Sequence, residues 1–132
     1  MKILYVDKYS FQTQTRISLI NDRLGHEVEL AETLDDVQKM FKKDLYEIVI
    51  ADHGTEEAMA ALDYIAGIDI EQRILTISAA VEHSVSQGCD YCVQNYRRRR
   101  LNNPTPIKNI LRMIEGFDLY SCDHYDGINK QR

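Results

Sequence analysis

The sequence contains little cysteine: three residues in a chain of 132. Three is an odd number, and a chain of this length can bury a hydrophobic core, so a disulfide framework is disfavoured and a reducing compartment is expected. Long apolar runs are missing as well. None approaches the roughly 18 residues that span a membrane, and the start MKILYVDKYS lacks the apolar stretch of a secretory signal. We therefore expect a cytoplasmic protein that does not enter a membrane.

Positive charge is also in short supply. The chain has 16 Lys and Arg against 21 Asp and Glu, which gives a net charge of −5 at pH 7. Phosphate backbones attract proteins with an excess of Lys and Arg, so nucleic-acid binding is disfavoured. The glycine patterns GxxxxGK and GxGxxG, which hold nucleotide phosphates, do not occur either. Nucleotide binding is therefore disfavoured too.

What the chain does have is the pattern of one layered α/β domain. Its hydrophobic content of 44% is enough for one core, and short apolar runs alternate with longer segments of helical period. That alternation predicts repeated strand–helix units around a parallel sheet. The first, third and fourth strands are apolar enough to be buried on both faces. The expected strands are residues 2–6, 26–30, 46–51, 73–78 and 91–95.

The spacing of apolar residues predicts the helices between these strands. Thr33 is expected to cap the second helix, and Gly25 to end the first in a left-handed conformation. The expected helices are residues 11–24, 34–43, 56–66, a shorter segment at 80–87 and a last helix that begins near Pro106. The side chains expected to face the core are Ile17, Ile20, Leu24, Val37, Met40, Phe41, Met59, Leu62, Ile65, Ile107, Ile110, Leu111 and Ile114.

Two acids and a hydroxyl end three of the expected strands. Asp7 ends the first strand, Asp52 the third and Ser78 the fourth. Ligands of an open parallel sheet bind at the carboxyl ends of its strands, so these side chains share one crevice if their strands are neighbours. Two carboxylates and a hydroxyl suit a hard cation such as Mg²⁺ and the acceptance of a phosphoryl group. The structural alternative is that such acids serve only as caps or turn formers.

The order of these motifs resembles a known family. ILYVD, YEIVIAD, ILTISA, a glycine followed by DYCV, and NPTPIKNILRMI occur in the order and approximate spacing of the receiver domain of bacterial response regulators. The resemblance covers residues 1–116 and leaves 117–132 as a C-terminal tail. It implies a doubly wound, flavodoxin-like sheet of five parallel strands in the order 2-1-3-4-5.

In that family, an aspartate at the end of the third strand accepts a phosphoryl group from a histidine kinase or phosphotransfer protein. The resemblance implies that Asp52 is this phosphoacceptor, that Asp7 and Asp52 bind Mg²⁺, and that Ser78 is the switch hydroxyl. Tyr91, in the expected fifth strand, would be the aromatic switch residue. The implied function is that of a single-domain response regulator in two-component signalling, which docks to a downstream target protein. Its one enzymatic step would be self-phosphorylation from a phosphodonor.

Two departures from the family pattern favour an alternative. Lys8 stands where the family has a second consecutive acid, which weakens the expected Mg²⁺ site and brings a competing ammonium toward Asp52. The family's lysine, which ends the fifth strand before a proline, is also missing. Gln94 takes its place in one alignment, and Asn103 before Pro104 in the other. The alternative is a degenerate pseudo-receiver that acts as a phosphorylation-independent interaction module.

The cysteines and the site loops suggest two further ligands, and both are disfavoured. Cys89, Cys92, Cys122 and His124 offer four ligands for zinc, but the second pair has an unusual spacing, and free cysteines are common packing residues. Flavin is the main enzymatic rival on this fold, but the loop DKYSFQT lacks the glycine that lets a backbone approach a phosphate. Neither zinc nor flavin is expected.

The basic run Arg97 to Arg100 has two interpretations. It contacts phosphate groups or the acidic surface of a partner, or it is a solvated loop that discourages pairing of the last strand. The surface around it, together with the tail, is expected to bind the partner protein or to form a homodimer.

Overall fold

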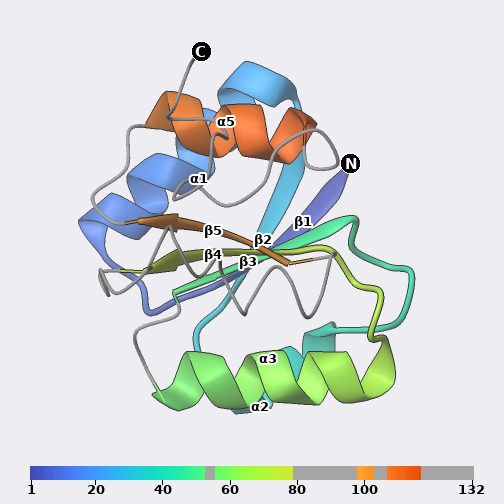
Figure 1. Ribbon diagram of the computed structural model, residues 1–132. Helices are drawn as coiled ribbons and strands as arrows, with labels where there is room; N and C mark the ends of the chain where they lie inside the picture. The colour runs from blue at the N-terminus through green and yellow to red at the C-terminus, as the bar shows by residue number, and fades with distance from the viewer. Residues whose placement is uncertain (53–55, 79–97, 103–106, 117–132) are drawn as a thin grey trace, which may run out of the picture.

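The computed structural model describes residues 1–52, 56–78, 98–102 and 107–116. Within them, five parallel strands form one sheet in the order β2-β1-β3-β4-β5 (Figure 1). The predicted α/β fold with a parallel sheet is confirmed, as is the order of its first four strands. The strands are β1 (Lys2–Val6), β2 (Glu27–Ala31), β3 (Ile48–Asp52), β4 (Ile74–Ser78) and β5 (Arg98–Asn102).

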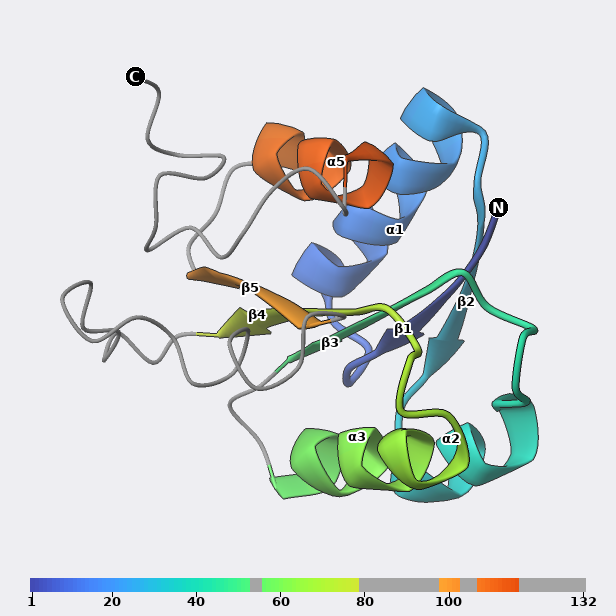
Figure 2. The ribbon, with the colours of Figure 1, turned by 45° about the vertical axis from the view of Figure 1, so that its right-hand side comes forward.

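Helices cover both faces of this sheet. Figures 1 and 2 show α1 and α5 on one face and α2 and α3 on the other, which is the doubly wound arrangement. None of the helices in the described ranges is long and apolar enough to cross a membrane. The helix predicted at 80–87 and the tail 117–132 lie outside the described residues. The helices are α1 (Phe11–Leu24), α2 (Leu34–Met40), α3 (Glu56–Ile68) and α5 (Ile107–Glu115).

The helix ends follow from capping residues. Thr33 accepts a hydrogen bond from the Asp36 amide and begins α2 as predicted, while Gly25 ends α1 in the left-handed conformation with φ of 66°. Two boundaries differ from the prediction. Helix α2 ends at Met40, because Phe41 turns to an extended conformation and buries its ring. Helix α3 continues through Gly67 to Ile68, so a glycine alone does not end a well-packed helix.

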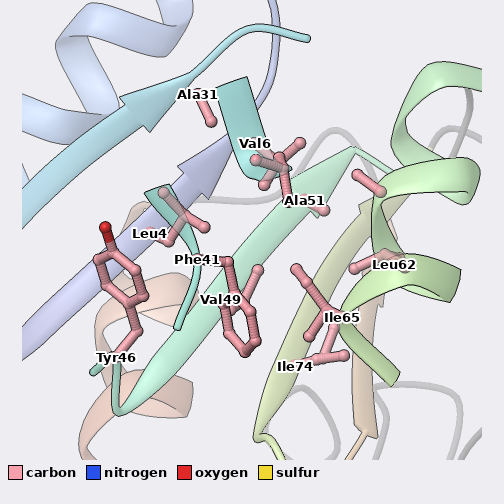
Figure 3. Packing of buried hydrophobic residues seen from close by; sticks show 12 residues of the cluster. Leu4, Val6, Ala31, Phe41, Tyr46, Val49, Ala51, Leu62, Ile65 and Ile74 are labelled. Atoms are coloured by element: carbon pink, nitrogen blue, oxygen red, sulfur yellow. The ribbon is translucent and has the colours of Figure 1, made fainter. Parts of the chain in front are cut away.

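Two hydrophobic clusters, one on each face of the sheet, form the core. The first joins Ile3, Tyr5 and Ile50 of the sheet to Ile20 of α1 and Ile110 of α5. The second lies between the sheet and the helices α2 and α3, where most of the packing side chains are drawn in Figure 3. Each fully buried aliphatic side chain contributes roughly 1.5–3 kcal/mol. Of the side chains predicted to face the core, the structure buries Ile20, Val37, Phe41, Leu62, Ile65, Ile110 and Ile114.

The fifth strand is where the sequence prediction was wrong. The strand that pairs with β4 is Arg98–Asn102 and not residues 91–95, which lie outside the described residues. Arg98 pairs with Ile74 and Leu101 with Ile77, so most of the basic run is strand rather than loop. The parallel ladder uses backbone groups, and a strand at the end of the order tolerates charged residues that a central strand would not.

Candidate functional site

The carboxyl ends of three neighbouring strands bring together the backbones of Asp7, Asp52 and Ser78. Val6 pairs with Ala51 across β1 and β3, and the next residues in the two strands' direction are Asp7 and Asp52. Asp52 in turn pairs with Ile77 of β4, and Ser78 follows. The prediction that the first and third strands are neighbours is therefore confirmed. The chemical roles of the three residues stay predictions.

The carboxylate of Asp7 is held by the chain that follows it. The side chain is half-buried, Oδ1 accepts the amide of Lys8 at 2.8 Å, and Oδ2 accepts the hydroxyl of Thr13 at 2.9 Å. The amide of Asp7 continues the sheet by donating to the carbonyl of Ala31 at 3.1 Å. Both carboxylate oxygens are thus fixed by protein donors.

Sequence reasoning missed Thr13. It lies in the first turn of α1, whose N-cap Ser10 accepts the Thr13 amide at 3.1 Å. Serine is a preferred N-cap residue, so the helix start was a signal available in SFQT, where Thr13 follows Ser10 by three residues. It does not reveal that the Thr13 hydroxyl turns back to Asp7, because that contact depends on how α1 leaves the sheet.

Carboxylates also fix the neighbouring loops. Glu32 Oε1 accepts the Tyr9 amide at 2.9 Å, and Asp36 Oδ2 accepts the Glu32 amide at 3.0 Å. Glu57, in the first turn of α3, accepts the Leu34 amide at 2.7 Å. The loop after β1, the start of α2 and the start of α3 are therefore joined by side-chain-to-backbone hydrogen bonds.

The remaining predicted site residues are only partly described. Lys8 is exposed, and its side chain makes no ion pair with the residues whose side chains the structure describes, which do not include Asp52. The backbones of Asp52 and Ser78 are described, but their side chains are not. Tyr91 and the four proposed zinc ligands, Cys89, Cys92, Cys122 and His124, lie outside the described residues. In the part of the chain that the structure covers, no three His, Cys, Asp or Glu side chains gather around a cation position.

The end of β5 favours one of the two alignments of the missing lysine. The strand ends at Asn102, and Asn103 and Pro104 follow directly in the sequence. Asn103 therefore stands where the resemblance expects a lysine before a proline. Gln94, the other candidate for this position, lies outside the described residues.

A second polar cluster lies at the amino ends of the strands, away from the candidate site. The buried Tyr46 donates its hydroxyl to Glu29 Oε1 at 2.6 Å, and Lys2 Nζ lies 3.2 Å from Glu29 Oε2. Burial, and then the bond to Glu29, raise the pKa of the Tyr46 hydroxyl well above its ordinary value. The Tyr46 bond, and then Lys2, lower the pKa of Glu29.

An open polar hollow of about 460 Å³ lies beside this second cluster. It is formed by the loops that precede β3 and β4, at the edge of the sheet opposite Asp7, so it is not the candidate site. Its lining residues are Lys43, Asp44, Tyr46, Glu47, Asp69, Glu71, Gln72 and Arg73.

Comparison with known proteins bears on the fold. No protein-family model matches the chain, and no curated protein matches its sequence. Many solved structures match its backbone. The receiver domain of HemR from Leptospira biflexa shares 15% identity and a TM-score of 0.65, over 91% of this chain and 95% of that one. A response regulator receiver protein from Sinorhizobium medicae shares 16% identity and a TM-score of 0.64, over 87% and 91%.

The chain has the receiver-domain fold. The same backbone also occurs in a structure described as an adenylate cyclase from Rhodopirellula baltica, with 18% identity and a TM-score of 0.68 over 89% of this chain and 86% of that one. The resemblance of the motifs to receiver domains is thus confirmed at the level of fold. Identities of 15% to 18% carry no chemistry with them, because one fold supports many functions. In this receiver-domain fold, Asp7, Asp52 and Ser78 occupy the edge at which ligands bind to open α/β sheets.

Proposed function

We propose that the chain is a receiver-type signalling module of a two-component system, with Asp52 as its phosphoacceptor. The observation that carries the proposal is the register of the sheet. It sets Asp52 between Asp7 and Ser78 at the carboxyl ends of three adjacent strands. No comparable set of two acids and a hydroxyl ends these strands at their amino side, where Lys2, Ile48 and Ile74 begin β1, β3 and β4.

The proposed chemistry is a phosphoryl transfer to a carboxylate. An oxygen of Asp52 attacks the phosphorus of a phosphohistidine or a small phosphodonor, and the bond between phosphorus and the donor breaks. The donor takes the electron pair, and the product is an acyl phosphate on Asp52. Ser78, on the adjacent strand, would then donate its hydroxyl to the transferred group. Such transfers depend mainly on positioning and on stabilisation of charge.

Asp7 and Asp52 are the residues that would hold Mg²⁺. This ion is commonly bound through one or two carboxylates, with water and phosphate oxygens completing its shell, so two strand-end acids fit it. Bound there, Mg²⁺ would neutralise part of the charge on the phosphoryl group. The Lys8 amide and the Thr13 hydroxyl orient the Asp7 carboxylate before any cation arrives. Lys8 lowers the negative charge beside it, which supports only weak binding.

A degenerate receiver that works without phosphorylation is the second candidate. Lys8 beside Asp7 and Asn103 after β5 favour it, because the first replaces an acid and the second leaves a transferred phosphoryl group without the family's lysine. In both candidates the output is docking to a downstream target protein in the cytoplasm. Only the first requires a histidine kinase or phosphotransfer protein as donor.

The deciding experiment is the intact mass of the protein after incubation with Mg²⁺ and acetyl phosphate. The proposal expects one added phosphoryl group, which is absent from Asp52→Asn. The matched control is Asp22→Asn, an exposed aspartate on α1, which must still be modified. An unmodified wild type at high donor concentration would favour the degenerate receiver. An adduct that survives in Asp52→Asn would assign the modification to another residue.

A further inference from the structure

The turn after β1 is held by a buried hydroxyl. Thr13 lies in the first turn of α1, and its residue is only 2% exposed. Its Oγ1 lies 2.9 Å from Oδ2 of Asp7, 3.1 Å from the carbonyl oxygen of Lys8 and 2.9 Å from Oγ of Ser10. Buried polar groups in native structures are hydrogen-bonded, and here a single hydroxyl joins three residues of one turn.

The chemistry of these neighbours decides where the Thr13 proton goes. A hydroxyl donates one hydrogen bond and accepts up to two. Hydrogen bonds to an ionised acceptor are about twice as strong as neutral ones. The Thr13 hydroxyl therefore donates its hydrogen bond to the Asp7 carboxylate in preference to the Lys8 carbonyl. Ser10 then donates its own proton to Thr13 Oγ1. The result is a chain of two hydrogen bonds, from Ser10 to Thr13 and from Thr13 to Asp7.

The start of α1 adds to the hold on Asp7. The first turn of α1 contains no acidic residue, although the N-terminus of a helix attracts negative charge. Asp7, bound to Thr13 in that turn, brings a carboxylate to this end. The Lys8 amide holds the other oxygen at 2.8 Å. The orientation of Asp7 is therefore set from α1 as well as from its own strand.

We propose that Thr13 is a positioning residue for the Asp7 carboxylate. Its hydroxyl fixes the carboxylate in the orientation in which Asp7 serves a cation beside Asp52. The part of this inference that assigns the orientation to cation binding rests on the proposed function. A carboxylate has roughly four lone-pair sites, so one that accepts hydrogen bonds can also bind a cation. A ligand held in this way does not have to be ordered when the cation arrives.

Hydrogen exchange of the Lys8 amide, which donates to Asp7 Oδ1, reports on the orientation of the Asp7 carboxylate without any metal. Lys8 is exposed, so the protection of its amide depends on the bond to Asp7. Thr13→Val keeps the side-chain volume but removes the hydroxyl, and we expect exchange at Lys8 to become roughly tenfold faster. Thr13→Ser keeps the hydroxyl and should leave the rate near that of the wild type. Thr13→Ala is the second variant, with the same expectation as Thr13→Val, if valine prevents folding.

A merely structural role of Thr13 predicts a different pattern. The Gln14 amide, which donates to the Ser10 carbonyl at 3.0 Å, reports on the start of α1. The inference expects its exchange to stay unchanged in Thr13→Val. Unchanged exchange at Lys8, or equal acceleration at Lys8 and Gln14, overturns the inference.

Mg²⁺ titration by calorimetry separates the inference from the proposed function. If the wild type binds Mg²⁺, Thr13→Val should bind it about tenfold more weakly and Thr13→Ser about as well. Equal affinity in the wild type and Thr13→Val overturns the inference and leaves the proposed function standing. If the wild type binds no Mg²⁺ but Lys8 exchange responds as expected, Thr13 does position Asp7, and the cation of the proposed function is refuted.

Discussion

The Tyr46 hydroxyl donates to the Glu29 carboxylate across the amino end of the sheet, at 2.6 Å. Tyr46 comes from the segment before β3 and Glu29 from β2, so the bond spans β1, which lies between these two strands. The Tyr46 ring also stacks on the ring of Phe41, with 6.3 Å between the ring centroids. Phe41 is the residue that directly follows α2. One side chain therefore connects the sheet to the loop that follows α2, as Figure 3 shows for Tyr46 and Phe41.

Removing this hydroxyl should weaken the fold. Tyr46→Phe keeps the ring stacked on Phe41 but leaves Glu29 with Lys2 as its remaining charged partner. Because Glu29 is partly exposed and water replaces part of the lost bond, we expect the free energy of unfolding to fall by about 1 kcal/mol. Urea unfolding measures it. Tyr64→Phe on α3 is the matched control and should change stability by less, so equal losses would contradict this account.

The same pair predicts how stability depends on pH. The folded-state pKa of Glu29 is lowered from 4.5, so its contribution is full above that value and is lost as the pH falls through the lowered pKa. The folded-state pKa of Tyr46 is raised from 10.0, so its contribution is full below that value and is lost as the pH rises past it. The stability difference between the wild type and Tyr46→Phe should therefore be largest between these values and shrink on both sides. A difference that is constant from acid to alkali would refute this.

Asp44 should be better replaced by glycine. It has φ of 68°, the one positive φ among the non-glycine residues in the described ranges, in the loop between α2 and β3. A side chain in the left-handed region costs roughly 1 kcal/mol, which glycine avoids, although glycine adds flexibility to the unfolded chain. We expect Asp44→Gly to raise the midpoint of thermal unfolding and Lys43→Gly, at an adjacent position without positive φ, to lower it. A lower midpoint for Asp44→Gly would count against strain at this residue.

Charge at position 8 should control the affinity for Mg²⁺. Lys8→Asp replaces an ammonium by a carboxylate next to Asp7, and we expect the affinity to rise by roughly tenfold or more. Lys42→Asp makes the same change of net charge at an exposed position after α2 and should have little effect. Calorimetric titration of both variants measures the change. Equal affinities would show that Lys8 is not the obstacle to the cation.

The sequence predicts the centre of this fold well because its signals there are local. The apolar runs of β1, β3 and β4 are buried on both faces, and Thr33 and Gly25 cap their helices through contacts a few residues away. The fifth strand failed for the opposite reason. RRRLN has no strand pattern of its own, and its pairing with β4 is a backbone interaction that side-chain types do not encode.

For the candidate site, the sequence predicts the acids at the strand ends but not what orients them. Asp7 and Asp52 follow from the rule that parallel strands end at a common edge. The Tyr9–Glu32 and Leu34–Glu57 bonds each join residues 23 positions apart, so they exist only once the loops have been packed. No spacing rule for helices or strands reaches that far.

These loop contacts have a mechanical consequence. The Tyr9 amide donates a hydrogen bond to Glu32, the Glu32 amide donates one to Asp36, and the Leu34 amide donates one to Glu57 of α3. If the Tyr9 segment shifts, either its hydrogen bond to Glu32 breaks or Glu32 moves with it and displaces the first turn of α2. That turn is itself hydrogen-bonded to Glu57 of α3. The amino ends of α2 and α3, on the face of the sheet opposite α1 (Figure 1), are therefore mechanically coupled to the segment that follows Asp7.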